Sequence, residues 1–310
     1  MEFIGNFFVV ASQVVTLFLL MGVGFVMAQL GKLHTDGVSQ MSTLVLYVVT
    51  PCLMINAFEV DRVPGMVETL GVFFVVYAAS TLLGMAVAQM CFRNEGPDRK
   101  APLRFGMTYG NNGFMGIPLV HAILGQDAML FGVVSAVSFN FLLWTQGAKT
   151  MGGKVGPRAI LVNPATVGAV IGGFLFFSGL RLPSMVNNAV SFMADLNTPL
   201  AMVVIGAQMA GADLKVSFTS RKLYSAAAVR LLIAPLIPLV LLMPLHLPAM
   251  SYCACVILCA VPTAGATGMF AQRFGRDTAT AAQLVTLTTL LSVITLPLFA
   301  VAAQTISGLV

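Results

Sequence analysis

Residues 109–118 carry the polar groups best suited to bind a ligand. Asn111 and Asn112 are adjacent amides flanked by Gly110 and Gly113, within a run otherwise apolar enough to cross a membrane. In a helix interior, glycine costs about 1 kcal/mol and proline about 3 kcal/mol relative to alanine, so the helix must break here. Broken backbone at membrane depth occurs only where protein covers it or where it lines a wet cavity. We therefore expect this break to form half of a substrate site.

A second interruption, at 261–268, supplies the other half of the expected site. It contains Pro262, Thr263 and Thr267. The two hydroxyls are expected either to bind substrate or to satisfy carbonyls freed within their own helix, and the sequence leaves both readings open. At the first break, Gly113 and Pro118 are expected mainly to shape the backbone.

Three further polar residues lie in apolar runs. Arg230 is a basic residue well inside a predicted span, which marks it for a charge role, although it could instead extend toward the cytoplasmic surface or pair structurally within the protein. Asp195 is a candidate for a coupling proton or, equally, a residue of the outer interface. Asn140 is expected to line the cavity or to hydrogen-bond between helices. We predict no metal site and no catalytic group, because the three histidines are far apart in the sequence.

The composition indicates an all-α polytopic membrane protein. Of 310 residues, 58% are hydrophobic and 9% are charged, and the mean hydropathy is +0.94. Soluble domains carry about 25% charged residues. The net charge of +5 lies in short loops, so it indicates topology and gives no support to a nucleic-acid partner.

Ten intervals are long and apolar enough to span a bilayer. They are residues 7–30, 38–58, 66–92, 102–124, 127–149, 164–181, 186–211, 221–246, 249–272 and 279–306. Thirteen of the sixteen Lys and Arg residues fall in alternate connections, which the positive-inside rule assigns to the cytoplasm. Both termini are therefore expected outside the cell.

The pattern of helix-breaking residues repeats between the two halves of the chain. Thr50-Pro51 in the second span matches Thr198-Pro199 in the seventh, and the broken fourth span matches the broken ninth. An odd number of spans per half inverts the second half, and paired interruptions are typical of a secondary transporter's binding site. We expect a first repeat at 1–150, a basic cytoplasmic linker at 151–163 and a second repeat at 164–310.

Two blocks of sequence resemble the auxin efflux carrier family, including its bacterial organic-acid (malonate-type) permeases. These are GNNGFMGIPLV at 110–120 and AVPTA at 260–264, the latter followed by AQRFG at 271–275. The chain has Gly-Ala-Thr-Gly at 265–268, where many members place an asparagine soon after the proline, so recognition in the second half is expected to fall on Thr263 and Thr267.

The resemblance implies a secondary active transporter in the cytoplasmic (inner) membrane that moves a small organic anion by an elevator mechanism. Spans 1, 2, 6 and 7 would form the scaffold, and spans 3–5 and 8–10 the moving transport domain. Gly168 and Gly172 form a close-packing motif, within one protomer or across a homodimer. No cofactor is expected, and proton coupling, sodium coupling and uniport all stay open.

Other functions find less support in the sequence. A passive anion channel should show polar residues along continuous helices rather than two paired breaks. A substrate-sensing receptor should carry a soluble output domain. An intramembrane enzyme is disfavoured because neither an H-E-x-x-H nor a G-x-S-x-G motif occurs.

Overall fold

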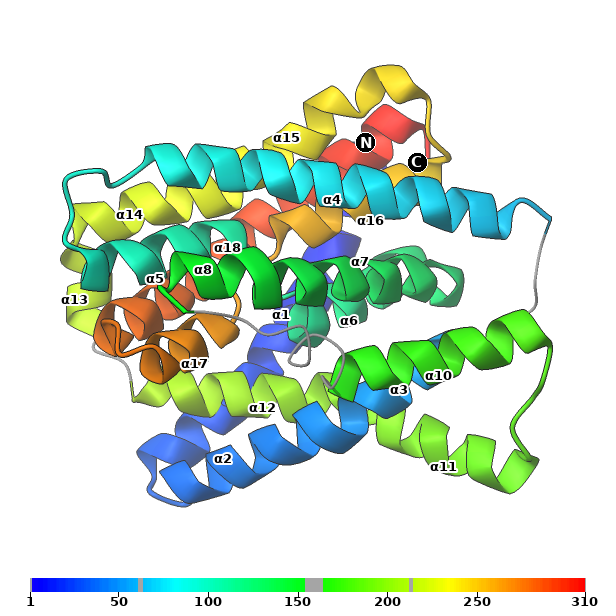
Figure 1. Ribbon diagram of the computed structural model, residues 1–310, viewed down its shortest axis with the longest axis horizontal. Coiled ribbons are helices and arrows are strands. Elements are labelled where there is room, and N and C mark those ends of the chain that lie inside the picture. The colour runs from blue at the N-terminus through cyan, green and yellow to red at the C-terminus, as the bar shows by residue number, and fades with distance from the viewer. Residues whose placement is uncertain (1, 61–63, 154–163, 212–213, 310) are drawn as a thin grey trace.

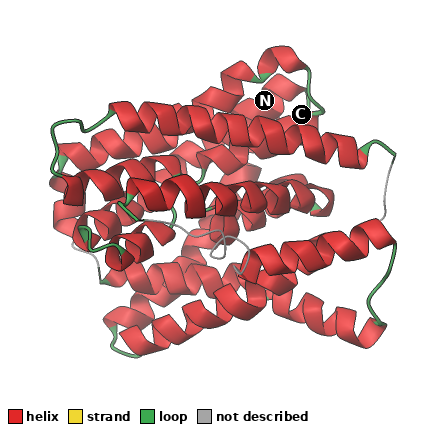
Figure 2. Cartoon of the chain, in the orientation of Figure 1, coloured by secondary structure: helices red, strands yellow, loops and turns green. Residues whose placement is uncertain are grey.

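The structure is a computed structural model that describes residues 2–60, 64–153, 164–211 and 214–309. The described residues are almost entirely helical, and their only β feature is one isolated bridge (Figure 2). Six helical stretches are long and apolar enough to cross a membrane: Thr35–Ala57, Met66–Met90, Gln126–Thr150, Ser184–Ala210, Arg221–Leu245 and Thr278–Ser307. The prediction of a multi-pass membrane protein is thereby supported, whereas ten crossings arranged as an inverted repeat stay a prediction.

The helices of the first half are α1 (Glu2–Gln29), α2 (Thr35–Leu44), α3 (Thr50–Ala57), α4 (Met66–Met90), α5 (Pro97–Thr108), α6 (Ile117–Leu124), α7 (Met129–Leu142) and α8 (Ala148–Thr150). Those of the second half are α10 (Pro164–Ser178), α11 (Ser184–Asp195), α12 (Asn197–Ala210), α13 (Leu214–Thr219), α14 (Arg221–Ala228), α15 (Ala234–Leu241), α16 (Ala249–Ala260), α17 (Ala266–Arg273) and α18 (Thr278–Ser307). Short π-helical turns join α2 to α3, α7 to α8 and α14 to α15 without ending the helix.

Two helix pairs are in backbone contact, and each joins one half of the chain to the other. A Cβ at Gly24 of α1 would lie 1.9 Å from the Val203 carbonyl oxygen of α12, and one at Gly206 of α12 would lie 1.8 Å from that of Met21. Glycine is required at such an approach because any side chain would collide with the partner backbone.

The second pair is α10 on α3. A Cβ at Gly168 would lie 2.6 Å from the Pro51 Cα, and one at Gly172 would lie 3.1 Å from the Ile55 Cα. The Gly168–Gly172 motif therefore packs within the protomer, which decides between the two readings that the sequence leaves open. The first helix of each half packs on the second helix of the other.

The most buried helix is α16, in which all ten residues from Ser251 to Ala260 are buried. It packs against α4, α6, α7, α15 and α18. By contrast, α10 exposes large apolar side chains such as Val170, Phe174 and Phe177. Exposed apolar surface of this extent is typical of helices that face lipid.

The connections gather at the two ends of the longest axis. In Figure 1 the α4–α5 loop, α13 and the turn after α17 lie at the left, whereas the α10–α11 loop lies at the right. The connections at the left are those to which the charge pattern assigns a cytoplasmic location. The separation agrees with the predicted alternation of basic and non-basic loops.

Candidate functional site at the crossing of the two broken helices

The first break separates α5 from α6. Helix α5 ends at Thr108, and Tyr109 is extended, with φ −98° and ψ 107°. A π-helical turn, Asn112–Gly116, then leads into α6. The chain changes direction at Gly110 and Asn111. Glycine has no side chain, and the asparagine side chain can hydrogen-bond to nearby backbone, so both residues tolerate irregular backbone that an apolar residue would not favour.

The second break meets the first in an antiparallel bridge between Gly110 and Thr263. The backbone N–H of Asn111 donates to the Pro262 carbonyl over 2.8 Å, and the backbone N–H of Ala264 donates to the Tyr109 carbonyl over 2.9 Å. The two interruptions thus satisfy part of each other's freed backbone, as buried polar groups require. This pairing holds two segments that are far apart in the sequence in one crossing.

Arg230 lies in the π-helical turn between α14 and α15 and is only 4% exposed. Its Nε donates to the Val261 carbonyl (2.9 Å), one Nη to Thr108 (3.0 Å) and the other to Cys259 (2.8 Å). These carbonyls belong to the C-terminal ends of α5 and α16, where helix dipoles are negative. The side chain therefore reaches the crossing and pairs there with backbone carbonyls, rather than extending toward the cytoplasmic surface.

The close approach of Arg230 depends on Gly110. A Cβ at Gly110 would lie 2.4 Å from an Nη atom of Arg230 and 2.8 Å from a methyl group of Val261. By contrast, a Cβ at Gly113 would meet nothing within 4 Å. The glycine at position 110 therefore keeps space for the guanidinium, whereas position 113 opens toward free space.

The hydroxyl and the backbone N–H of Thr263 both donate hydrogen bonds within the protein. Its hydroxyl donates to the Gly106 carbonyl of α5 over 2.9 Å, and its amide donates to the Thr288 hydroxyl of α18 over 3.1 Å. The side chain is completely buried. Thr263 therefore ties the second break to α5 and α18, and it satisfies a carbonyl of a different helix rather than one of its own.

Asn112 is buried yet only half satisfied. Its Nδ2 donates to the Tyr77 hydroxyl and, over 3.4 Å, to the Ser135 hydroxyl. Its Oδ1 has no hydrogen-bond partner among the described residues. A buried oxygen without a partner costs roughly 1–3 kcal/mol, which makes it a candidate contact for a ligand. The Asn111 side chain, 8% exposed, likewise makes no hydrogen bond with the described residues.

Backbone donors without acceptors lie at the N-terminal ends of both half-helices. The N–H groups of Gly113 and Phe114 in the first break, and of Gly265 and Ala266 in the second, donate to no described residue. All four residues are half-buried. Next to them, the Thr267 hydroxyl is buried and has no partner in the described structure. A helix N-terminus with free donors favours the binding of an anion.

A paired break that leaves donors free in a helical, apolar protein is the geometry of a carrier's binding site. The sequence profile of the family described as "Membrane transport protein" matches residues 9–160 and 150–300. The chain belongs to this family of membrane transport proteins. The match confirms the resemblance to the auxin efflux carriers. The protein is also 22% identical, over 300 residues, to an "Uncharacterized transporter" of Methanothermobacter thermautotrophicus, which covers 94% of this chain and 97% of the relative.

Two residues at the crossing were missed by sequence reasoning. Asn197, at the start of α12, is 1% exposed, and its amide reaches the Gly113 carbonyl at 3.5 Å. It stands directly before the repeated Thr-Pro pair, which is a signal that could have found it. Tyr77 of α4 contacts Asn112, and nothing in the surrounding apolar sequence distinguishes it from a core tyrosine.

The remaining predicted residues of the transporter lie farther along its helices. Pro118 and the exposed Asp195 line a cavity of about 220 Å³ beside α3, α6 and α12, together with Asn56, His121 and Asn197. The Asn140 amide donates to the Ala136 carbonyl of its own helix over 2.8 Å. The described residues contain no group of three His, Cys, Asp or Glu side chains able to hold a metal ion.

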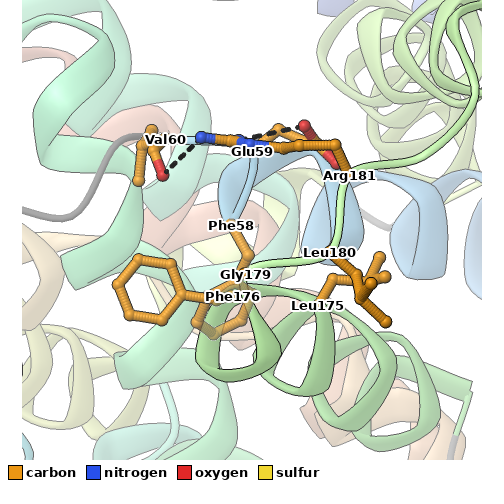
Figure 3. A pocket seen from close by; sticks show the side chains of 8 residues that line it. All are labelled: Phe58, Glu59, Val60, Leu175, Phe176, Gly179, Leu180 and Arg181. Carbon is orange, nitrogen blue, oxygen red and sulfur yellow. Dashed lines mark hydrogen bonds and ion pairs between the residues drawn. The ribbon is translucent and has the colours of Figure 1, made fainter.

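Another cavity of the transporter, of about 180 Å³, lies between the ends of α3 and α10 (Figure 3). Its charged groups engage each other, because Arg181 pairs with Glu59 over 3.1 Å. Arg181 also reaches the Val60 carbonyl at 3.4 Å. This cavity is lined by helices outside the crossing, so its charged residues are better explained as a tie between α3 and the α10–α11 loop.

Proposed function

We propose that this membrane transport protein is a secondary carrier of a small organic anion, a malonate-like carboxylate or dicarboxylate, with its site at the crossing of the two broken helices. The observation that carries the proposal is the set of four unpartnered backbone N–H groups at Gly113, Phe114, Gly265 and Ala266. They belong to two half-helices that begin at the same crossing. A carboxylate accepts several hydrogen bonds and suits the positive ends of helix dipoles.

Electrostatics favour an anion over a cation as substrate. The C-terminal ends of α5 and α16 are negative, but Arg230 donates to their carbonyls. The buried charged side chains of the described chain include Arg230 and no Asp or Glu. The N-terminal ends of the two half-helices that follow the breaks therefore keep a positive partial charge that no described side chain neutralises. They lie in a low-dielectric region, where Coulomb attraction is strong. A carboxylate is the partner that restores the balance.

Side chains beside the free amides supply selectivity. Asn111 offers an amide without a partner, and Thr267 offers a hydroxyl. Exchange of the nitrogen and oxygen positions of the Asn112 side chain lets Tyr77 donate to the oxygen and turns the NH₂ group toward the substrate. Because amides and hydroxyls both donate and accept, the site also suits a carboxylate that carries a hydroxyl or a protonated second carboxyl group.

We propose an elevator movement of the crossing relative to a scaffold. The glycine contacts of α1 with α12 and of α3 with α10 make the expected scaffold a tightly packed unit. The crossing, with Arg230 and Thr263, makes the expected transport domain a second one. The Asn197–Gly113 hydrogen bond links the two units through a long, weak contact of 3.5 Å, which a sliding movement could break and remake.

The surroundings of the site complete the proposal. We propose a protein of the cytoplasmic membrane with both termini outside, acting as a homodimer. A coupling ion, H⁺ or Na⁺, remains open, with Asp195 in its cavity beside His121 as the candidate proton carrier. Substrate access from the outside would use this cavity, because Pro118 and Asn197 line it and belong to elements that meet at the crossing.

A thermal-shift screen of the purified protein against malonate, malate, lactate, pyruvate, citrate and indole-3-acetate tests the proposal. At least one carboxylate should stabilise the protein, and the same compound should show counterflow in proteoliposomes. Stabilisation by none of these anions would contradict an organic-anion site. Flux indifferent to substrate on the opposite side would favour a channel over a carrier.

A further inference from the structure

A cavity of about 440 Å³ lies at the end of the molecule where the basic loops gather, away from the crossing. It is bordered by the end of α4, the start of α5, α8 and the turn that precedes α18, at the left of Figure 1. Its lining comprises Gln89, Pro97, Lys100, Ala101, Arg104, Gln146, Lys149, Thr150 and Arg276. Four of these side chains are cationic, and none is acidic.

The positive charge in this cavity is poorly neutralised by the protein. Arg104 directs Nε and one Nη to the Cys91 carbonyl and the other Nη to the Gln89 amide oxygen, so it contacts no carboxylate among the described residues. Arg276 pairs with Asp98, whose side chain is 73% exposed and stands outside the lining. Such an exposed ion pair has little strength.

The two lysines carry the remaining charge. Lys100 makes a long contact of 3.4 Å with the Arg93 carbonyl, and the Lys149 ammonium donates to no described residue. Four cations that share one cavity repel each other. This arrangement is stable only if an anion accompanies it or if water separates the charges. The cavity is large enough for a ligand of many atoms.

The floor of the cavity is connected to the crossing. The Tyr109 hydroxyl donates to the Gln146 side-chain oxygen over 2.8 Å, and the Gln146 amide donates to the Thr150 hydroxyl over 2.8 Å. The Thr150 hydroxyl hydrogen is left without a described acceptor. The backbone carbonyl of Tyr109 also accepts the hydrogen bond from the Ala264 N–H that pairs the two breaks. Two hydrogen bonds therefore join Thr150, a residue that lines the cavity, to Tyr109 at the crossing.

We propose that this cavity is a second anion site, which binds a phosphate group from the cytoplasmic side and stabilises the adjoining helix ends. Phosphate carries up to two negative charges and three acceptor oxygens, and arginine and lysine together form its usual protein partners. The same chemistry occurs in soluble phosphate and in an anionic phospholipid headgroup, and basic pockets at the cytoplasmic ends of membrane helices bind such headgroups.

The test compares two phosphate sources on the full-length purified protein. One arm adds inorganic phosphate or pyrophosphate at constant ionic strength in a neutral detergent. The other compares nanodiscs of phosphatidylcholine with nanodiscs that contain phosphatidylglycerol. The double variant Lys100→Gln/Lys149→Gln removes two cations that make few contacts, so it should fold. Lys32→Gln, an exposed lysine of the α1–α2 loop, is the control of matched chemistry.

In at least one arm, phosphate should raise the melting temperature of the wild type and of Lys32→Gln. The double variant should lose most of this shift, with an apparent affinity weaker by roughly tenfold or more. The response should persist in Asn112→Ala, which separates this site from the proposed carboxylate site. No shift in either arm, an equal shift in the double variant, or malonate matching phosphate at equal ionic strength would overturn the proposal.

Discussion

The two breaks that form the crossing use their polar groups in opposite ways. At the second break, the Thr263 hydroxyl and amide both bind other helices, and Arg230 holds the nearby carbonyls. At the first break, the Asn112 oxygen and the Asn111 side chain lack described partners. The inverted repeat predicted from the sequence would make the two backbones alike but leave each side chain free to differ. We propose that Thr263 and Arg230 make the second break mainly an anchor, and that the asparagine side chains make the first break the main recognition surface.

This division would explain how one asparagine pair could serve the proposed site, which is made from two breaks. Both breaks contribute free backbone donors, which attract any carboxylate. Selectivity, however, requires side chains that are held in place but not fully satisfied. Tyr77 and Ser135 hold one end of the Asn112 side-chain amide, while its other end has no described partner. The anchor supplies the rigidity against which that amide is positioned.

The largest expected effect follows from removing the Arg230 clamp, by which we mean the three hydrogen bonds that its guanidinium donates to carbonyls at the crossing. Arg230→Met leaves the carbonyls of Thr108, Cys259 and Val261 without the donor that now satisfies them. We expect a loss of about 3 kcal/mol or more in stability, because each such group costs roughly 1–3 kcal/mol when unsatisfied. The measurement is the melting temperature of the purified protein in detergent.

Arg181→Met is the matched control for that experiment. Arg181 forms an ion pair with Glu59, but its side chain is 49% exposed, so its loss should cost about 1 kcal/mol or less. Arg230→Lys should recover little, because an ammonium cannot reproduce three directed guanidinium contacts. Equal melting temperatures for the Arg230 and Arg181 variants would show that the clamp does not hold the crossing.

A smaller effect distinguishes two glycines of the first break. Gly110→Ala places a methyl group 2.4 Å from Arg230 and 2.8 Å from Val261, and overpacking of this kind costs roughly 1–3 kcal/mol. Gly113→Ala meets nothing within 4 Å and should change stability by about 0.5 kcal/mol or less. Melting curves without substrate measure both, and equal losses would contradict the packing of Arg230 against position 110.

The difference between anchor and recognition surface should also appear in stability without substrate. Thr263→Val removes a buried hydrogen bond to the Gly106 carbonyl and should cost about 1 kcal/mol or more. Asn111→Ala removes a side chain without a described hydrogen bond and should cost less. Chemical or thermal unfolding of the two variants in the same detergent gives the ranking. A reversed order would remove the distinction between the breaks.

The sequence predicts the framework of this crossing but not the division between its halves. Glycine, proline and adjacent amides cannot continue a helix, so the positions of both breaks follow from local chemistry. The assignment of thirteen basic residues to alternate loops follows from electrostatics. By contrast, the target of the Arg230 guanidinium depends on carbonyls of α5 and α16, which are distant in sequence.

The same limit applies to Tyr77 and Thr263. Each acquires its role from a partner on another helix, and local patterns carry no trace of such partners. Thr263 and Thr267 look alike in sequence, yet one is fully hydrogen-bonded and the other has an unpartnered hydroxyl. Spacing alone cannot distinguish an anchoring threonine from one that faces a ligand.

The smallest expected effect concerns the support of the anchor by α18, which carries Thr288. Asp277 caps this helix by accepting hydrogen bonds from the Thr280 amide (2.9 Å) and hydroxyl (2.7 Å). Partial burial raises the pKa of Asp277. The hydrogen bonds from Thr280 and the positive charge of Arg99 together lower this pKa by a larger amount, so it lies below its ordinary value.

A lowered carboxyl pKa stabilises the folded state above the ordinary pKa of about 3.9, and this contribution is lost as the pH falls through the folded value. The loss should be under about 1 kcal/mol, because the group is largely solvated. The melting temperature of the wild type should therefore fall slightly more than that of Asp277→Ala between about pH 6 and pH 3. Identical pH profiles would exclude this contribution.

The most direct test of the division between recognition and anchoring is the affinity of Asn112→Ala and Thr263→Val for the carboxylate that stabilises the wild type, measured by calorimetric titration. We expect Asn112→Ala to remain folded and to lose detectable binding, and Thr263→Val to be less stable while keeping an affinity within about threefold of the wild type, a difference below 1 kcal/mol. Wild-type affinity in Asn112→Ala, or lost binding in a folded Thr263→Val protein, would contradict the account.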